Sequence, residues 1–209
     1  MQLTHFGHAC VLVSDGTTRV LFDPGTFSDG WADLTDLDAV VVTHSHPDHL
    51  DTDRLPGLLA ANRGARLVTD VASAQDLGEH DPQAVQAGEQ VALGGLSARV
   101  VGGSHAIIHP DIPTIPNVGF VVEDGAFYHP GDSYAEPGHP VDVLGLPTGA
   151  PWLKVSEAVE FFRRVSPRVA VPIHEAVLAD PSMHVAMFDS LKPAGSSVRR
   201  LDRGVATQV

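Results

Sequence analysis

The sequence is short of several residue types and patterns, and each shortage excludes a class of protein. Its 209 residues include one cysteine, Cys10, so no intrachain disulfide can form and a cytoplasmic location is expected. No apolar run approaches the roughly 20 residues that a membrane-spanning helix needs. The N-terminus lacks the basic start and apolar core of a signal peptide. We therefore expect a cytoplasmic protein that has no membrane partner.

Basic residues are also scarce. The chain has 13 lysines and arginines against 26 acidic residues, which gives a formal net charge of -13, and its basic pairs are Arg163–Arg164 and Arg199–Arg200. Binding to RNA or DNA normally requires a concentrated positive patch that displaces counterions. This composition excludes nucleic acid as the main substrate. A small-molecule substrate is the remaining expectation, and the oligomeric state stays open.

Short β-type segments and a few amphipathic stretches alternate along the chain, in two halves that each begin with strands and end with helices. Residues 1–209 fit a single domain long enough to bury a substantial core. Because each sheet needs helices to cover its outer face, this order predicts an α/β (α+β) fold of four layers, an αββα sandwich. The expected strands are 9–13, 19–22, 39–43, 66–69, 90–93, 97–101, 119–122, 125–128, 141–146 and 168–173, and the expected helices are 50–62, 71–77, 156–165 and 183–191.

The most informative segment follows a valine-rich apolar run. Residues 44–49 read HSHPDH, which places four potential metal ligands within six residues. Neutral imidazoles and carboxylates bind divalent metals, and on an extended backbone His44 and His46 point to the same face because they are two apart. The proline that follows bends the chain, which aims Asp48 and His49 at a neighbouring position. The spacing therefore predicts two adjacent metal ions.

Three more polar residues, His105, Asp132 and His174, each follow a predicted strand, where a site at the edge of a sheet would collect side chains. Gly131 lets the backbone turn sharply, so that the carboxylate of the next residue can point inward. Taken singly, a histidine at the end of a strand or an aspartate in a Gly-Asp turn more often has a structural role than a metal-binding one. Together with the histidine-rich motif they predict one shared site, and the long loop 102–117, stiffened by three prolines, is expected to line it.

With these residues in place, the chain resembles the metallo-β-lactamase-fold superfamily of metallo-hydrolases. The resemblance rests on the segment 43–51 together with His105, Asp132 and His174, whose order and spacing match the family pattern through nearly the whole chain. Within the superfamily, the chain looks most like the ascorbate-6-phosphate-lactonase-like branch. The segments that carry the resemblance to this branch are 6–10, 21–24, 131–132 and 171–174.

The resemblance implies an enzyme, a metal-dependent hydrolase with two divalent ions, Zn²⁺ in preference to Mn²⁺. Hydroxide bound to the two ions would attack an ester, lactone or phosphoester of a small molecule. Asp48 or the loop residue His109 would serve as the catalytic group that moves the proton, and Asp23 would orient a ligand imidazole. The implied ligands are His44, His46 and His105 for the first ion, Asp48, His49 and His174 for the second, and Asp132 as the bridge.

Several points stay open at the level of the sequence. His109 competes with His105 as the third ligand of the first ion. His129 is an alternative to His109 as the loop histidine that moves the proton or is a solvated loop residue, and the role of His8 stays open. Two other functions are compatible with the same fold. One is a mononuclear-iron oxidoreductase of the persulfide-dioxygenase type, which would use two of the histidines and the aspartate, and the other is a non-catalytic metal-binding protein. The complete second set of ligands favours two metals and hydrolysis.

Overall fold

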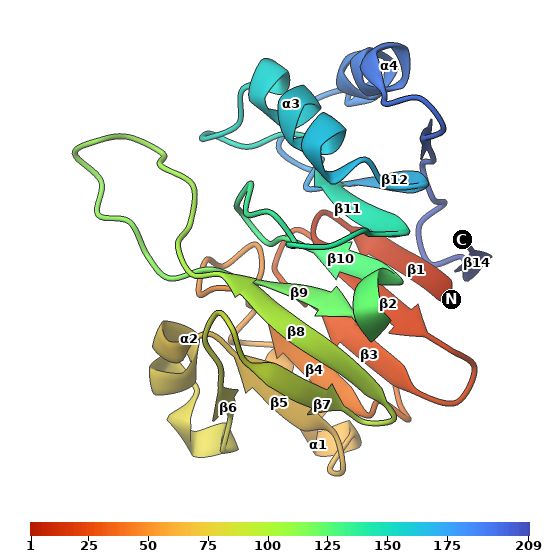
Figure 1. Ribbon diagram of the computed structural model, residues 1–209. Coiled ribbons are helices and arrows are strands. Elements are labelled where there is room, and N and C mark those ends of the chain that lie inside the picture. Colours follow the sequence, from red (N-terminus) through yellow and green to blue (C-terminus); the bar gives the residue numbers. More distant parts are fainter.

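Two seven-stranded β-sheets pack face to face in the computed structural model, which describes residues 1–209 (Figure 1). The first sheet contains β1 (Gln2–Gly7), β2 (Cys10–Ser14), β3 (Arg19–Phe22), β4 (Ala39–Val42), β5 (Arg66–Thr69), β6 (Gln83–Ala84) and β14 (Thr207–Gln208). The second contains β7 (Gln90–Leu93), β8 (Leu96–Gly102), β9 (Val118–Val122), β10 (Phe127–His129), β11 (Val143–Pro147), β12 (Val169–Ile173) and β13 (Ser197–Val198). The α-helices are α1 (Leu55–Ala61), α2 (Val71–Asp76), α3 (Val155–Val165) and α4 (Ser182–Leu191), and short 3₁₀ turns occupy Gly78–His80 and Glu123–Gly125.

The two sheets are similar in the order and direction of their strands. Their strand orders are β14-β1-β2-β3-β4-β5-β6 and β13-β12-β11-β10-β9-β8-β7. In each half of the chain the early strands pair antiparallel, as β1 to β3 and β7 to β10 do, and the strands that follow pair parallel. The C-terminal β14 is the exception, because it pairs antiparallel with β1. Parallel strands are usually buried on both faces, so each sheet needs a layer of helices outside it.

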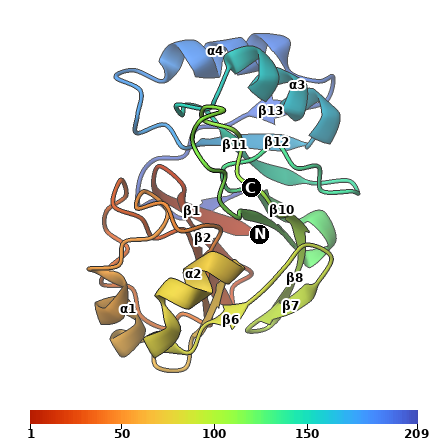
Figure 2. The ribbon, with the colours of Figure 1, turned by 90° about the vertical axis from the view of Figure 1, so that its left-hand side faces the viewer.

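Those helical layers are present. Helices α1 and α2 cover the outer face of the first sheet, and α3 and α4 cover that of the second (Figures 1 and 2). A core of 22 buried residues lies between the sheets, and cores of 13 and 12 residues lie on their outer sides. Strand β4 serves two of these cores, because Ala39 and Val41 face the other sheet while Val40 and Val42 face the side of α1. The predicted four-layer αββα sandwich is confirmed.

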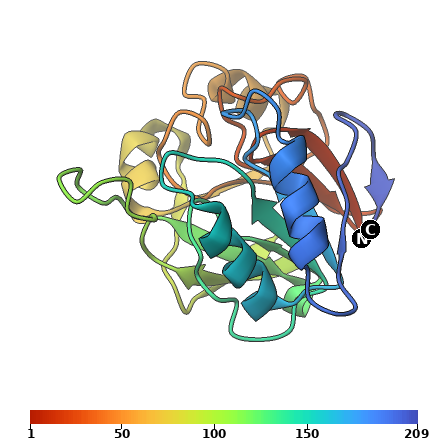
Figure 3. The ribbon, with the colours of Figure 1, turned by 90° about the horizontal axis from the view of Figure 1, so that it is seen from above.

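The expected strands and helices are present, with bounds that differ by a few residues. Helix α1 begins at Leu55 rather than at residue 50, because the Asp51 carboxylate accepts hydrogen bonds from the backbone N–H groups of Asp53 and Arg54 and holds a turn there. The apolar pattern does not indicate β1, and it does not indicate the two-residue strands β6, β13 and β14 either. Strand β14 pairs with β1, so the chain ends lie side by side (Figure 3).

The segment 103–117 leaves the end of β8 and projects away from the sandwich before it returns to β9 (Figures 1 and 3). It is the loop that the sequence predicts beside the site.

None of the helices has the length and apolar character needed to cross a membrane.

Candidate metal centre

The candidate site is built from residues that directly follow strands. His8 comes immediately after β1 and His174 immediately after β12, while His44 is the second residue after β4. His105 and Asp132 stand three residues beyond the ends of β8 and β10. Strands from both sheets therefore deliver these side chains to one edge of the sandwich, as the sequence predicts.

The backbone at this edge adopts a conformation that most residues avoid. His8, Asp23 and His174 have positive φ angles of 52°, 46° and 59°. A non-glycine residue in the left-handed region costs about 1–3 kcal/mol, and such residues gather at functional sites. Each of the three comes directly after a strand, so the left-handed turn is what redirects the chain and aims the side chain inward.

Two glycines allow close approach around the motif. A Cβ atom on Gly25 would lie 1.8 Å from the backbone oxygen of Asp48. Gly131 has a φ of 61°, and a Cβ atom there would lie 2.3 Å from the side-chain oxygen of Asn117. That oxygen accepts a hydrogen bond of 2.9 Å from the backbone N–H of Asp132, so it fixes the turn that carries this carboxylate.

Eight side chains form two neighbouring clusters, and within each cluster the potential ligand atoms all lie within 4.8 Å of one another. All seven residues expected as metal ligands fall into these clusters, and His8 joins them as an eighth. The sequence offers one weak signal for His8, its place in a Gly-His turn after a β segment. The first cluster is His44, His46, His105 and Asp132, and the second is His8, Asp48, His49 and His174.

Asp132 touches both clusters. Its Oδ1 atom lies 3.0 Å from His49 Nε2 and 3.1 Å from His174 Nε2, and its Oδ2 atom lies 3.3 Å from His105 Nε2. The carboxylate is 3% exposed, so these imidazoles rather than water surround it. Asp132 is therefore shared between the two clusters.

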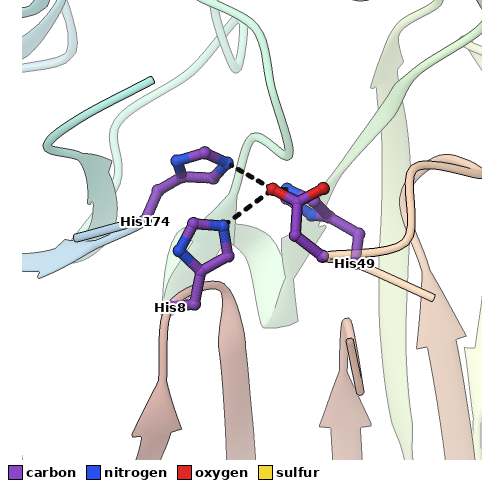
Figure 4. A group of neighbouring side chains, drawn as sticks. His8, His49 and His174 are labelled. Atoms are coloured by element: carbon purple, nitrogen blue, oxygen red, sulfur yellow. Dashed lines mark hydrogen bonds and ion pairs between the residues drawn. The ribbon is translucent and has the colours of Figure 1, made fainter. Parts of the chain in front are cut away.

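In the second cluster, imidazoles from three separate parts of the chain approach one carboxylate (Figure 4). Asp48 Oδ2 lies 2.9 Å from His8 Nε2 and 3.4 Å from His174 Nε2. His8 Nδ1 accepts a hydrogen bond from the backbone N–H of Ala176, which leaves the proton of a neutral ring on Nε2 to be donated to Asp48. His8 therefore orients Asp48.

Three histidines of the clusters are held in place by hydrogen bonds at Nδ1, the ring nitrogen that points away from the site. His49 Nδ1 donates to Asp23 Oδ2 at 2.7 Å, as the sequence analysis expects of Asp23. The Nδ1 atoms of His105 and His174 donate to the backbone carbonyl groups of residues 106 and 149. These hydrogen bonds fix the tautomer and direct each Nε2 lone pair into the site, which is how proteins prepare histidine for a metal.

The directed atoms make no hydrogen bond of good geometry, although His49 Nε2 and His174 Nε2 lie in ion-pair contact with Asp132 Oδ1. Of the eight buried side-chain nitrogen and oxygen atoms that lack one in this protein, four belong to the clusters: His49 Nε2, His105 Nε2, His174 Nε2 and Asp132 Oδ1. Leaving a buried polar atom unsatisfied costs about 1–3 kcal/mol. A divalent cation coordinated by imidazole and carboxylate would satisfy all four, so the donor set fits a metal.

Burial keeps several of the imidazoles neutral. It lowers the pKa of His44 well below the ordinary value and also lowers the pKa of His46. Burial likewise lowers the pKa of His8 to about 4, against the opposing hydrogen bond with Asp48. At pH 7 these three rings are uncharged, which is the form in which histidine binds a metal.

The carboxylates shift the pKa of the remaining groups. Burial alone would lower the pKa of His174, but the Asp132 carboxylate outweighs it and raises the pKa to about 9. Burial is likewise outweighed at His49, whose pKa is raised well above its usual value by Asp132 and Asp23. At Asp132 burial would raise the pKa, but His49 and His174 hold it well below its ordinary range. A divalent cation would replace the protons that the two rings hold.

Trp152 belongs to the site as well. The sequence places it in a segment, 147–152, that is expected to line the cleft, but it does not predict a contact with Asp132. Its indole Nε1–H donates a 2.7 Å hydrogen bond to Asp132 Oδ2. The ring also meets His105 edge to face, at 6.1 Å between centroids, and packs in the same way against Tyr134. Trp152 therefore fixes the rotamer of the Asp132 carboxylate.

Two histidines with open roles lie outside both clusters. His109 is on the projecting loop with its side chain 61% exposed, and its Nδ1 accepts a hydrogen bond from the backbone N–H of Asp111. The structure brings His105, and not His109, into the first cluster. His129 is fully buried, bonds to the Ala9 carbonyl group through Nε2, and accepts from Gly131 N–H through Nδ1. It braces the turn that precedes Asp132.

Comparison with known proteins agrees with this geometry. A family model described as a beta-lactamase superfamily domain matches residues 2–174. Protein Rv0786c of Mycobacterium tuberculosis is 51% identical over 183 residues, which cover 86% of either chain. A UPF0173 metal-dependent hydrolase of Opitutus terrae is 31% identical over 240 residues, with 100% of both chains covered.

A solved structure has the same fold. Igni18, a metallo hydrolase from the archaeon Ignicoccus hospitalis, superposes with a TM-score of 0.76 at 22% identity and covers 99% of this chain and 97% of its own. The protein therefore belongs to the family of β-lactamase superfamily domains, and among these to the UPF0173 family. The superfamily predicted from the motif is thereby confirmed.

Proposed function

We propose that this protein is a metal-dependent hydrolase with two divalent ions, zinc in preference to manganese, that acts on an ester, lactone or phosphoester of a small molecule. The observation that carries the proposal is the Asp132 carboxylate, because one of its oxygen atoms faces His49 and His174 while the other faces His105. A side chain in that position can serve two ions at once. The relative from Opitutus terrae, which is named a metal-dependent hydrolase, supports the same conclusion.

The residues would divide the work as follows. His44, His46 and His105 would hold one ion and Asp48, His49 and His174 the other, with Asp132 between them. When bound, a pair of divalent ions makes water a nucleophile at neutral pH and polarises the oxygen of the bond to be broken.

The protein side chains would position the ligands and move protons. Asp48, whose side chain is 20% exposed, is the most accessible member of the second cluster and would accept a proton from water. His8 holds Asp48 in place through its Nε2–H. Asp23 and Trp152 hold His49 and Asp132 in the same way. The catalytic role predicted for His109 stays a prediction, and an activity measurement on a His109→Ala variant loaded with metal tests it.

Three finer points belong to the proposal. The segments 6–10 and 171–174 support membership of the ascorbate-6-phosphate-lactonase-like branch. The scarcity of basic residues supports a small-molecule substrate rather than a nucleic acid. A cytoplasmic location and a single domain over 1–209 stay predictions from the composition and length of the chain.

The deciding experiment is elemental analysis of protein purified without chelators, combined with a hydrolysis screen of lactones, esters and phosphoesters. We expect about two equivalents of zinc or manganese and measurable hydrolysis. The Asp132→Ala variant should lose metal and activity. His139→Ala is the matched control, because His139 is a half-buried histidine outside both clusters, and this variant should retain both properties.

Two other outcomes would overturn the proposal. One equivalent of iron, with oxygen uptake in the presence of thiol substrates, would favour the mononuclear-iron oxidoreductase. Wild-type metal content in Asp132→Ala would refute the bridging role of that carboxylate.

A further inference from the structure

The isoleucines of this protein are concentrated in one place. Four of the five isoleucines in the chain lie between residues 107 and 115, in the loop that projects from the end of β8 (Figure 1). We call the segment 105–115 the isoleucine loop. Ile107 and Ile112 are 66% and 49% exposed, so this loop presents large apolar side chains to solvent instead of burying them. Exposed apolar groups that gather in one place mark binding surfaces.

The isoleucine loop shares a hollow with the first cluster. The hollow is about 20 Å³ in volume, and two of its walls are the imidazoles of His46 and His105. The other lining residues come from the loop and include three isoleucines, and no lysine or arginine lines the hollow. These loop residues are Ala106, Ile108, Ile112, Pro113, Thr114 and Ile115.

The open side of the first cluster faces this hollow. His46 is the one half-buried member of the cluster, whereas the other three members are buried. A molecule that reaches the cluster past His46 therefore meets isoleucine on its way. Pro110, Pro113 and Pro116 limit the conformations of the loop, so less conformational entropy is lost when a ligand orders it.

We infer that the isoleucine loop binds an uncharged aliphatic part of the substrate, next to the bond that is hydrolysed. The substrate class is then an ester or lactone with a short aliphatic chain, rather than a molecule with a phosphate at that position. This inference rests on the proposed function, and it adds the chemical class of the substrate. The hollow accommodates one small group, and Ile112, which lines it and is 49% exposed, extends the apolar wall toward solvent. Ile107 is 66% exposed on the same loop.

A binding experiment tests the loop without relying on turnover. Alkyl hydroxamates of two to six carbons carry a constant metal-binding head and a growing chain, and calorimetry on the zinc-loaded protein gives their affinities. Complete burial of a methylene is worth about fourfold in affinity, so a half-exposed wall should give about twofold per methylene. The double variant Ile107→Ser with Ile112→Ser should abolish this increase, so that the affinity no longer depends on chain length.

The control is Met183→Ser, which removes a side chain that is 61% exposed on helix α4, outside the hollow and both clusters. It should retain the full dependence on chain length. Both changed isoleucines are exposed, so the double variant should fold like the wild type, and circular dichroism checks this. A chain-length dependence that survives in the double variant, or that is absent from the wild type, would overturn the inference.

Ester hydrolysis separates this inference from the proposed function. With p-nitrophenyl esters of the same chain lengths, kcat/KM should rise with length in the wild type and stay flat in the double variant. If no ester, lactone or phosphoester is hydrolysed, the proposed function fails, whatever the hydroxamates show. If esters are hydrolysed at rates independent of length, only the inference fails. If the wild type is a dimer and the double variant is a monomer with the length dependence intact, the loop contacts a second copy of the chain. That result would also overturn the inference.

Discussion

At the scale of single residues, the indole of Trp152 makes a contact that a substitution can isolate. Trp152→Phe retains an aromatic ring against His105 and Tyr134 but removes the N–H that donates to Asp132 Oδ2. Loss of a group that orients a ligand typically lowers metal affinity about 10–100-fold. We expect a decrease of that size for Trp152→Phe, measured by competition with a chromogenic chelator.

Trp31→Phe is the control for this experiment. Trp31 is also fully buried, but its Nε1 has no hydrogen-bond partner, and its ring packs beneath the Arg54 guanidinium at 4.6 Å. Metal affinity should be unchanged in Trp31→Phe. Each variant retains one of the two tryptophans, so metal addition should change the fluorescence of Trp31→Phe much more than that of Trp152→Phe. Equal metal affinities in the two variants would show that the indole N–H does not hold the bridge.

The residues of the site differ in how far the sequence predicts them. The motif 44–49 is predictable because its ligands are close in the sequence and follow a buried strand. His105, Asp132 and His174 are predictable in type and order through the family resemblance. Trp152 is not, because its contact with Asp132 depends on how two loops 20 residues apart meet in space, and tryptophan is most often a core residue.

At the scale of elements, the turn that follows β3 supports the metal motif. Gly25→Ala would place a Cβ atom 1.8 Å from the backbone oxygen of Asp48 and 2.5 Å from the nitrogen of His49, so the motif must move. Forced overpacking of this kind costs about 1–3 kcal/mol of unfolding free energy. We expect that loss in urea denaturation, together with weaker metal binding.

The matched control for the glycine change is Gly57→Ala in helix α1. A Cβ atom at Gly57 would meet nothing within 4 Å, and alanine is the better helix former by roughly 0.8–1 kcal/mol. This variant should be as stable as the wild type or more stable, with unchanged metal binding. A loss of unfolding free energy in Gly25→Ala together with no loss in Gly57→Ala would show that the close approach at Gly25 causes the destabilisation. Equal losses in the two variants would contradict this explanation.

An ion pair between the starts of two strands gives stability a dependence on pH. Arg168 donates two hydrogen bonds, of 2.7 and 2.8 Å, to the carboxylate of Asp142, and these bonds lower the pKa of Asp142 below 3.8. A carboxyl whose folded pKa is depressed stabilises the fold above its unfolded pKa, and this contribution disappears as the pH falls through the folded pKa.

Asp142→Asn should therefore lower the unfolding free energy at pH 7, by about 0.2–1 kcal/mol for an exposed pair. The deficit should shrink as the pH drops below 3.8, the ordinary pKa of the carboxyl. Urea denaturation at a series of pH values measures it. Asp33→Asn, at an exposed position, is the control and should show no such deficit. A deficit that does not change with pH would refute the electrostatic explanation.

The elements of the fold also divide by how local their signals are. Strands β2 and β3 and the Asp70 cap of α2 are predictable, because a short continuous apolar run and a side-chain cap are each signals that span only a few residues. Strand β1 is less so, because the buried polar residues Thr4 and His5 interrupt its apolar pattern. Strand β14 consists of two residues, and its pairing with β1 depends on the two ends of the chain meeting.

At the scale of the whole molecule, the metal centre and the hydrophobic cores are separate sources of stability. The centre draws residues from both sheets and fastens their ends together, whereas the cores lie between the layers and include no member of the two clusters. A ligand that binds the folded state alone stabilises it by about 4 kcal/mol when its concentration is 1,000 times its Kd.

Removal of the metal should consequently lower the melting temperature without unfolding the protein at 25 °C. For a chain of this size 1 kcal/mol corresponds to about 2–4 °C, so we expect a decrease of roughly 8–16 °C after treatment with EDTA. Differential scanning calorimetry gives the decrease, and circular dichroism checks that the chelated protein retains its secondary structure. In Asp132→Ala, which should bind little metal, EDTA should have almost no further effect. If EDTA leaves the melting temperature of the wild type unchanged, the two clusters hold no ion that contributes to stability. If EDTA unfolds the chain at 25 °C, the hydrophobic cores alone do not maintain the fold.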